Sequence, residues 1–260
     1  NFSKVLEEII KAIIDAKFEF KDVNAMIIVI SELNQIYEGF GQKFMESLKK
    51  TISDYNDTLA KSNAKNEEDE EKRQTRKKAL YRLFIESYIY GIFNDFNMIR
   101  DLLTNMLKKE QKEQFYNEFP ILVNLLKVFA ESLFNFKPKS VKKLIEKGEI
   151  EPYELKITLK KELADKYLDG FSGFYSKRVL VFLEEEHKTL VELEKKNFEN
   201  MRKLDSNNEI NQAYQKQRTF YLKYIGLINE FAEILDFDIP ELANEKTFRF
   251  EEQKKNEIVI

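Results

Sequence analysis

Residues that could perform acid–base or metal chemistry are few in this sequence. His187 is the only histidine among the 260 residues, and there is no cysteine. A general base, a pair of histidine ligands or a serine–histidine triad would therefore depend on His187 alone. This residue lies in the segment EEEHKTL, on the apolar side of a charged helical stretch. We predict that it packs against a neighbouring helix.

Two acidic runs, Glu184–Glu186 and EEDEE at 67–71, raise the question of a carboxylate metal site. Consecutive residues of a helix point in different directions, so neither run can gather around one ion. Di-iron sites in helical bundles need Glu-x-x-His motifs on separate helices, and one histidine cannot supply two. We interpret both runs as solvated faces, and predict no catalytic, cofactor-binding or metal-binding residue, no cofactor and no enzymatic activity.

Two glycine pairs, Gly39 with Gly41 and Gly170 with Gly173, do not form phosphate-binding loops. The pattern G-x-x-x-x-G-K-[ST] is absent, and no predicted strand precedes either pair. We predict that both pairs mark breaks between helices or tight crossing points.

A basic cluster is the remaining candidate site. Its members are Lys72, Arg73, Arg76, Lys77, Lys78 and Arg82. Contact with RNA or with an acidic partner is one interpretation, because phosphate contacts need only well-placed cations and Tyr81 and Phe84 are nearby aromatics. The other interpretation is a solvated helix start, because the preceding acids partly neutralise the cluster and the aromatics fall on the predicted core stripe.

Overall composition argues for long helices and against a strongly basic nucleic-acid binder. The net charge is −3, from 46 acids and 43 bases, and charged residues make up 34% of the chain. Only seven glycines and four prolines interrupt it. The longest uncharged apolar run, Ala25–Ile30, is far short of the roughly 18 residues that cross a bilayer. We predict a soluble, intracellular protein without membrane contact.

The elements that would position these residues are nearly all helical, because apolar residues recur at i, i+3, i+4 and i+7 along most of the chain. We predict about ten helices stacked as an all-α solenoid of about five antiparallel pairs, similar to HEAT repeats. Residues 1–240 would form one monomeric domain with a charged connector near 61–75, and 241–260 an irregular tail. Acids precede bases in the connector, which predicts that a helix begins inside the acidic run.

Gly91 lies within the apolar segment ESYIYGIFNDFNMIRDLL at 86–103. A glycine inside a helix costs roughly 1 kcal/mol relative to alanine, so its place calls for a reason. The apolar flanks predict that Gly91 is buried and lets a neighbouring helix approach closely. Further along, a helix beginning near Asn117 would hold Pro120 in its first turn, where proline is tolerated.

Four segments, in order, resemble one family. They are NAMIIVISELNQIYEGF (24–40), LFIESYIYGIFNDFNMIRDLL (83–103), YSKRVLVFLEEEHKTLVELEKKNFENMRKLD (175–205) and YIGLINEFAEILDFDIPEL (224–242). The set is similar to the first middle domain of the up-frameshift scaffold family of nonsense-mediated mRNA decay. Middle domains of this family resemble that of initiation factor four gamma.

This resemblance implies an all-helical scaffold domain without an active site, in the cytoplasm or its perinuclear region. The family bridges the decay helicase and the third up-frameshift factor, mainly through other parts of the full-length protein. No binding residue of those parts can be carried over to this chain. Two alternatives stay open: a helical-repeat module that binds RNA directly, and an unrelated α-solenoid adaptor.

Overall fold

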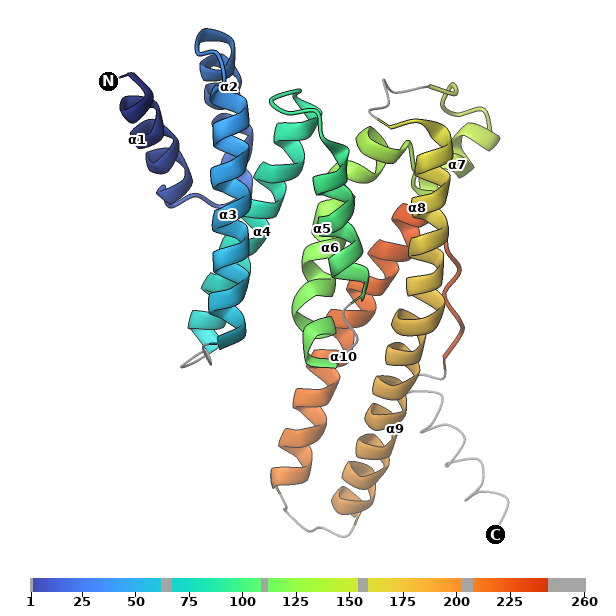
Figure 1. The fold of residues 1–260 in the computed structure, drawn as a ribbon. Helices are drawn as coiled ribbons and strands as arrows, with labels where there is room; N and C mark the ends of the chain where they lie inside the picture. Colours follow the sequence, from blue (N-terminus) through green and yellow to red (C-terminus); the bar gives the residue numbers. More distant parts are fainter. Residues whose placement is uncertain (1, 62–66, 109–111, 154–158, 203–207, 243–260) are drawn as a thin grey trace. The chain divides into compact units, whose positions relative to one another are not determined.

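A computed structural model describes residues 2–61, 67–108, 112–153, 159–202 and 208–242. Within these ranges there are ten α-helices and no strand (Figure 1), which confirms the all-α class and the expected helix number. The helices are α1 (Phe2–Asp15), α2 (Val23–Ile36), α3 (Phe40–Lys61), α4 (Glu67–Ile89), α5 (Phe96–Lys108), α6 (Lys112–Phe134), α7 (Lys139–Glu146), α8 (Lys161–Phe174), α9 (Leu180–Arg202) and α10 (Asn208–Leu235). A 3₁₀ turn, η1 (Phe20–Asp22), precedes α2, and a π-helical turn, η2 (Tyr175–Val179), joins α8 to α9.

The chain divides into two compact units. The first comprises residues 1–133 and 156–158, and the second comprises residues 134–155 and 159–260. The first unit therefore holds α1 to α5 and most of α6, and the second holds α7 to α10. The predicted single domain over residues 1–240 stays a prediction, and the predicted tail at 241–260 lies almost entirely outside the described residues.

Helix α4 is the centre of the first unit, where it contacts η1, α2, α3 and α5. Every side chain from Ala79 to Ser87 is buried. A helix that is covered on all sides needs apolar residues all round, and LYRLFI in this stretch supplies most of them. The polar residues among them must therefore find partners inside the unit.

The start of α4 confirms that a helix begins inside the acidic run, since the helix begins at Glu67. Acidic residues at a helix N-terminus are favoured by the helix dipole. The basic cluster consequently lies in the interior of α4 instead of in its first turn. Residues 62–66 of the predicted connector lie outside the described residues.

The end of α4 corrects the prediction for Gly91. This glycine lies just beyond the helix with φ +71°, and its N–H donates to the carbonyl of Tyr88 at 3.0 Å. The N–H of Ile92 donates to the carbonyl of Ser87 at 2.9 Å, which completes a Schellman motif. Gly91 is exposed, and no atom lies within 4 Å of where a Cβ would be. Gly91 therefore permits a left-handed turn and is not a buried packing point.

The close approach of another segment that was expected at Gly91 occurs at Gly41 instead. The N–H of Gly41 donates to Oδ1 of Asn34 at 2.9 Å, and a Cβ there would collide with the backbone oxygen of Ile92. Gly39, with φ +77°, makes the break between α2 and α3, as predicted. The prediction for the second glycine pair is wrong. Gly170 and Gly173 lie inside α8, with no neighbour within 4 Å of a Cβ.

Helix α6 starts earlier than predicted. It begins at Lys112, so Pro120 lies in its interior and not in its first turn. Proline there removes one backbone donor of the helix, and Nδ2 of Asn124 donates to the Pro120 carbonyl at 2.7 Å. No single helix in the described residues is long and apolar enough to cross a bilayer; α6 reaches that measure only when it is taken with α7 as a bent pair.

The second unit is held together by aromatic rings. Rings of α8, η2 and α10 meet those at the end of α6 and in the segments after α6 and α10, with centroids 4.9 to 6.4 Å apart. The participants are Phe134, Phe136, Tyr167, Phe171, Phe174, Tyr175, Phe231 and Phe237. Helices α8, η2 and α9 follow one another without a break, and α10 returns antiparallel beside α9 (Figure 1).

Candidate functional site

His187 and the acidic run Glu184–Glu186 lie together on α9. The His187 ring packs 5.8 Å from the ring of Tyr221, as expected for a residue between helices. Within the described residues, no group of three or more His, Asp or Glu side chains could hold a metal ion. Glu184 and Glu185 are exposed as predicted, whereas Glu186 is buried and accepts a hydrogen bond from Nε2 of Gln217 at 2.7 Å.

Arg76 of the basic cluster closes the end of α1. Its Nη1 donates to the carbonyl of Ala16 at 2.8 Å, and its Nη2 donates to the carbonyl of Ile14. The guanidinium also stacks over the Phe18 ring at 4.2 Å. Carbonyls at a helix C-terminus lack intrahelical donors, and a cation there also suits the helix dipole. Burial lowers the pKa of Arg76.

Arg82 has an equally complete set of partners. Its Nε donates to Oε1 of Glu86 at 2.7 Å, its Nη1 to the carbonyl of Phe20 at 2.6 Å, and its Nη2 to Oδ1 of Asn24. The guanidinium stacks over the Phe20 ring at 4.5 Å, and Nζ of Lys78 lies 5.5 Å from the same ring. Arg82 and Lys78 of α4 therefore both hold η1 in place.

Lys77 is the most deeply buried cation of the cluster. It is 4% exposed and forms a salt bridge with Glu118 of α6, which is 6% exposed. Nζ of Lys77 also lies 5.5 Å from the centroid of Tyr81. Burial, and secondly the negative charge of Glu118, raise the pKa of Tyr81, which keeps its hydroxyl neutral. This hydroxyl exchanges hydrogen bonds with the amide of Asn56.

The structure thus brings the six cations together on one helix but turns them in several directions. Lys72 is exposed and Arg73 is half-buried, with its carbonyl accepting a hydrogen bond from the Tyr55 hydroxyl at 3.0 Å. Contact with RNA or an acidic partner through the cluster stays a prediction. For Arg76, Lys77 and Arg82, such contact would require the interactions inside the unit to break.

An apolar groove lies between α1 and α2 in the first unit. Its volume is about 510 Å³, and every lining residue is apolar. The lining consists of Ile9, Ala12, Ile13, Ala16, Phe18, Ala25, Met26, Val29 and Ile30. Ligand pockets have volumes of roughly 300–1,000 Å³ but also hold a few convergent polar groups. This groove has none, so it suits an apolar surface better than a small polar molecule.

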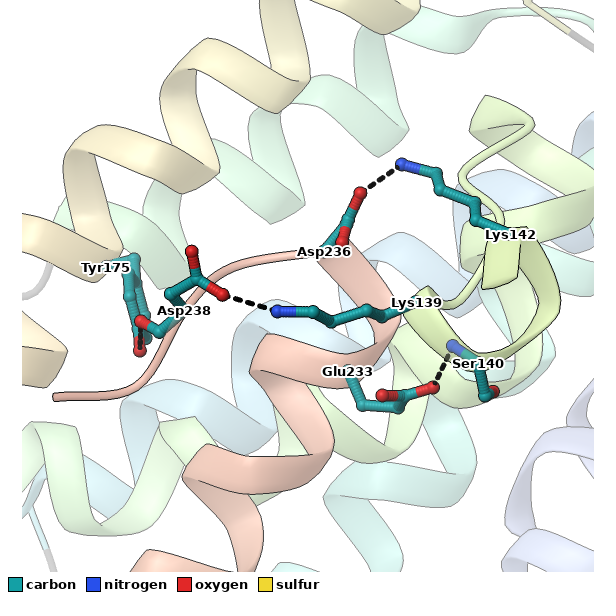
Figure 2. Close-up of polar contacts among 7 residues, drawn as sticks. All are labelled: Lys139, Ser140, Lys142, Tyr175, Glu233, Asp236 and Asp238. Atoms are coloured by element: carbon teal, nitrogen blue, oxygen red, sulfur yellow. Dashed lines mark hydrogen bonds and ion pairs between the residues drawn. The ribbon is translucent and has the colours of Figure 1, made fainter. Parts of the chain in front are cut away.

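A polar network in the second unit joins the end of α10 to the start of α7 (Figure 2). Oε1 of Glu233 accepts a hydrogen bond from the N–H of Ser140 at 2.7 Å. Lys142 pairs with Asp236 at 2.7 Å, and Lys139 pairs with Asp238. The Tyr175 hydroxyl donates to the carbonyl of Asp238 at 2.8 Å. These contacts fix the segment that follows α10.

The network shifts the pKa values of four of its members, Glu233, Asp238, Lys139 and Tyr175, in the directions that stabilise it. The hydrogen bonds from Ser140 and the charges of nearby lysines lower the pKa of Glu233. Lys139 lowers the pKa of Asp238, and Asp238 in turn raises the pKa of Lys139. Burial and the Asp238 charge raise the pKa of Tyr175 to about 12. All four groups therefore keep their paired state at neutral pH, which describes a fixed joint and not a proton-transfer site.

Sequence reasoning missed both the groove and the network. The run AMIIVI at 25–30 was the available signal for the groove, because it places apolar residues on more faces of α2 than one core contact can cover. The network had no local signal, since its partners are separated by 63 to 99 residues along the chain.

Comparison with curated proteins finds relatives along nearly the whole chain. It is 25% identical over 255 residues to the regulator of nonsense transcripts UPF2 of Arabidopsis thaliana, covering 96% of this chain and 20% of that protein. It is 23% identical to regulator of nonsense transcripts 2 of Homo sapiens, covering 95% of this chain and 18% of that protein. The chain therefore spans about a fifth of the length of these relatives. No protein-family model matches the sequence.

Among solved structures, the first MIF4G domain of human nonsense-mediated decay factor UPF2 is similar to this chain, with a TM-score of 0.75 and 20% identity. The match covers 94% of this chain and 75% of that one. This similarity confirms the expected helical-repeat architecture, and the curated relatives confirm the resemblance inferred from the four segments. Over most of its length, the chain is therefore similar in sequence to UPF2 regulators of nonsense transcripts, and its helical fold is similar to that of the first MIF4G domain of human UPF2.

Proposed function

We propose that this chain is a non-catalytic scaffold domain of a nonsense-mediated mRNA decay factor and supports assembly of the surveillance complex through protein contacts. The observation that carries this proposal is the match to UPF2 regulators over 95–96% of the chain. The side chains that could do chemistry are instead committed to packing and to helix joints, as for His187 and Glu233. The helicase and the third up-frameshift factor would bind other parts of the full-length protein.

Replacement of the full-length protein by a form that lacks residues 1–260 tests the scaffold role. The readout is the half-life of a reporter mRNA with a premature stop codon, measured beside a reporter with a normal stop codon. We expect the first half-life to lengthen and the second to stay unchanged, with equal protein abundance. Unchanged decay of both reporters, together with unchanged co-purification of other decay factors, would overturn the proposal.

The substitution His187→Ala tests the non-catalytic part of the proposal. Because His187 is the only histidine among residues 1–260, acid–base catalysis by an imidazole of this segment would be lost in the variant. We expect normal reporter decay, since the ring packs against Tyr221. His187→Phe, which keeps a ring at this position, is the matched control for packing. Loss of decay in both variants at unchanged thermal stability would argue for a chemical role.

A further inference from the structure

The groove between α1 and α2 continues an exposed apolar surface. Val29 is 54% exposed and Val5 is 52% exposed, although both belong to helices that pack on the core with their other faces. Ile36, seven residues after Val29 and therefore on the same face of α2, is 66% exposed. Apolar side chains thus extend beyond the lining of the groove along both helices. An extended apolar surface of this kind typically marks an interaction site.

A helix is the occupant that the groove can accept. Its apolar lining offers no donor or acceptor to a peptide backbone. An extended peptide would bury its N–H and C=O groups there without partners, which costs free energy for each group. A helix satisfies these groups internally and presents one apolar stripe. From Val5 to Asp15, α1 rises about 15 Å, so about three turns of a parallel or antiparallel helix would fill the groove.

The charged residues beside the groove indicate which side chains should flank the apolar stripe of the bound helix. On α1, Glu8 and Asp15 lie next to Ala12 at i−4 and i+3, and both are exposed. On α2, Glu32 lies next to Val29 at i+3 and is also exposed. The lysines of α1, Lys4 and Lys11, lie further round the helix from Ala12, and the exposed Lys17 lies at the end of the groove, between Ala16 and Phe18. Both edges of the groove therefore present carboxylates, which complement lysine or arginine on an incoming helix.

We propose that the α1–α2 groove binds an amphipathic helix of a partner protein, whose apolar stripe is flanked by lysine and arginine. This inference rests on the proposed scaffold function and names one class of partner for it. Arg76 acts here as a positioning residue, because it holds the end of α1 and the Phe18 ring at the floor of the groove.

A designed peptide tests this proposal on the chain of residues 1–260. The probe is a fluorescein-labelled helical peptide with leucines on one face and lysines elsewhere, and its matched control has glutamate in place of every lysine. Binding is measured by fluorescence anisotropy at 150 mM salt. We expect the basic peptide to bind at least tenfold more tightly than the acidic one, because the groove edges are acidic. Equal binding of the two peptides, or binding of neither, would overturn the proposal.

Matched variants locate the binding site. Val29→Glu should weaken binding of the basic peptide at least tenfold without changing the melting temperature, because the side chain is exposed. Val181→Glu introduces the same charge at a 46% exposed valine of α9 and should leave binding unchanged. Glu32→Lys should weaken binding of the basic peptide and strengthen that of the acidic one. Wild-type binding by Val29→Glu would overturn the assignment.

Sedimentation distinguishes a second copy of the chain as the occupant. We expect a monomer at all concentrations used for the anisotropy measurement. A dimer that dissociates on Val29→Glu would assign the groove to a second copy and overturn the proposal. The peptide assay uses the purified chain and is independent of the reporter assay. Failure of the peptide to bind would overturn the groove assignment alone, whereas unchanged reporter decay would overturn the scaffold function.

Discussion

Helix α4 and the α7–α10 joint use the same kinds of ion pair in different surroundings. In α4, Lys77 and Arg82 pair with Glu118 and Glu86, and all four side chains are buried. At the joint, Lys142 pairs with Asp236 where both side chains are more than a third exposed. A buried charge that loses its partner is strongly destabilising, whereas an exposed pair contributes little. The comparison teaches that burial, and not the number of ion pairs, decides how far each region depends on its charges.

The largest effect is expected from Lys77→Met. This substitution leaves the Glu118 carboxylate buried without its cation, so the free energy of unfolding should fall by about 3–5 kcal/mol. Urea denaturation followed by circular dichroism measures the loss. The double variant Lys77→Met/Glu118→Leu removes both charges and should recover most of the stability. A loss below about 1 kcal/mol in the single variant would show that the buried pair behaves like an exposed one. It would contradict the difference inferred between α4 and the α7–α10 joint.

Arg76→Ala should have the second largest effect. Arg76 is half-buried, so its burial is intermediate between that of Lys77 in α4 and that of Lys142 at the α7–α10 joint. The variant loses two charged hydrogen bonds to α1 carbonyls and the contact with Phe18, at about 2–3 kcal/mol. Hydrogen exchange should show the loss at the end of α1 first. Arg76→Lys keeps the charge without the planar fork, so it should recover only part of the protection. Full recovery would contradict the geometric role of the guanidinium.

Glu233→Gln should have a smaller effect, about 0.5–1 kcal/mol, since Glu233 is a solvent-accessible cap of α7. The folded-state pKa of Glu233 lies below its ordinary value of 4.5. Its stabilisation is therefore complete above that value and is lost as pH falls through the lowered folded-state pKa. Wild type and variant should differ at pH 7, and the difference should shrink as pH falls below 4.5. A difference that does not shrink below pH 4.5 would contradict the charge-based origin.

The smallest effect is expected in RNA binding. Contact of single-stranded RNA with all six cations of the cluster would give log K a slope near −4 against log salt. Because Arg76, Lys77 and Arg82 are engaged inside the unit, we expect weak binding and a slope no steeper than about −2. Anisotropy of a labelled oligonucleotide between 50 and 200 mM salt measures it. A slope near −4 would show that buried cations leave their partners and would support the RNA-binding alternative.

Helical periodicity was enough to predict the fold class, because each helix buries one face at a regular spacing. Gly91 was misread because an apolar flank suits both a buried glycine and a Schellman end. The apolar Ile92 directly after the glycine was the distinguishing signal. The tight contact at Gly41 could not be predicted, since Ile92 approaches from more than 50 residues away.

The partners of the basic cluster were beyond sequence reasoning for a similar reason. Arg76 contacts residues 60 and 62 positions earlier, and Lys77 contacts Glu118, which is 41 positions later. A run of cations looks solvated until such distant carbonyls and carboxylates are placed around it. The apolar groove was missed because the hydrophobic run at 25–30 was weighed only as a membrane span, whereas Val29 within it is exposed.

The π-helical turn η2 has a consequence for how this long helix can change during evolution. Buried positions follow Tyr167, Phe171 and Phe174 in α8 but continue one position later, at Tyr175, Val179 and Phe182. The N–H of Leu180 donates to the carbonyl of Tyr175, five residues back, so the turn holds one extra residue. An ancestral insertion that kept both halves facing the same core would leave this mark. Deletion of Ser176 would remove the turn, rotate α9 by about 100° relative to α8 and expose its buried face.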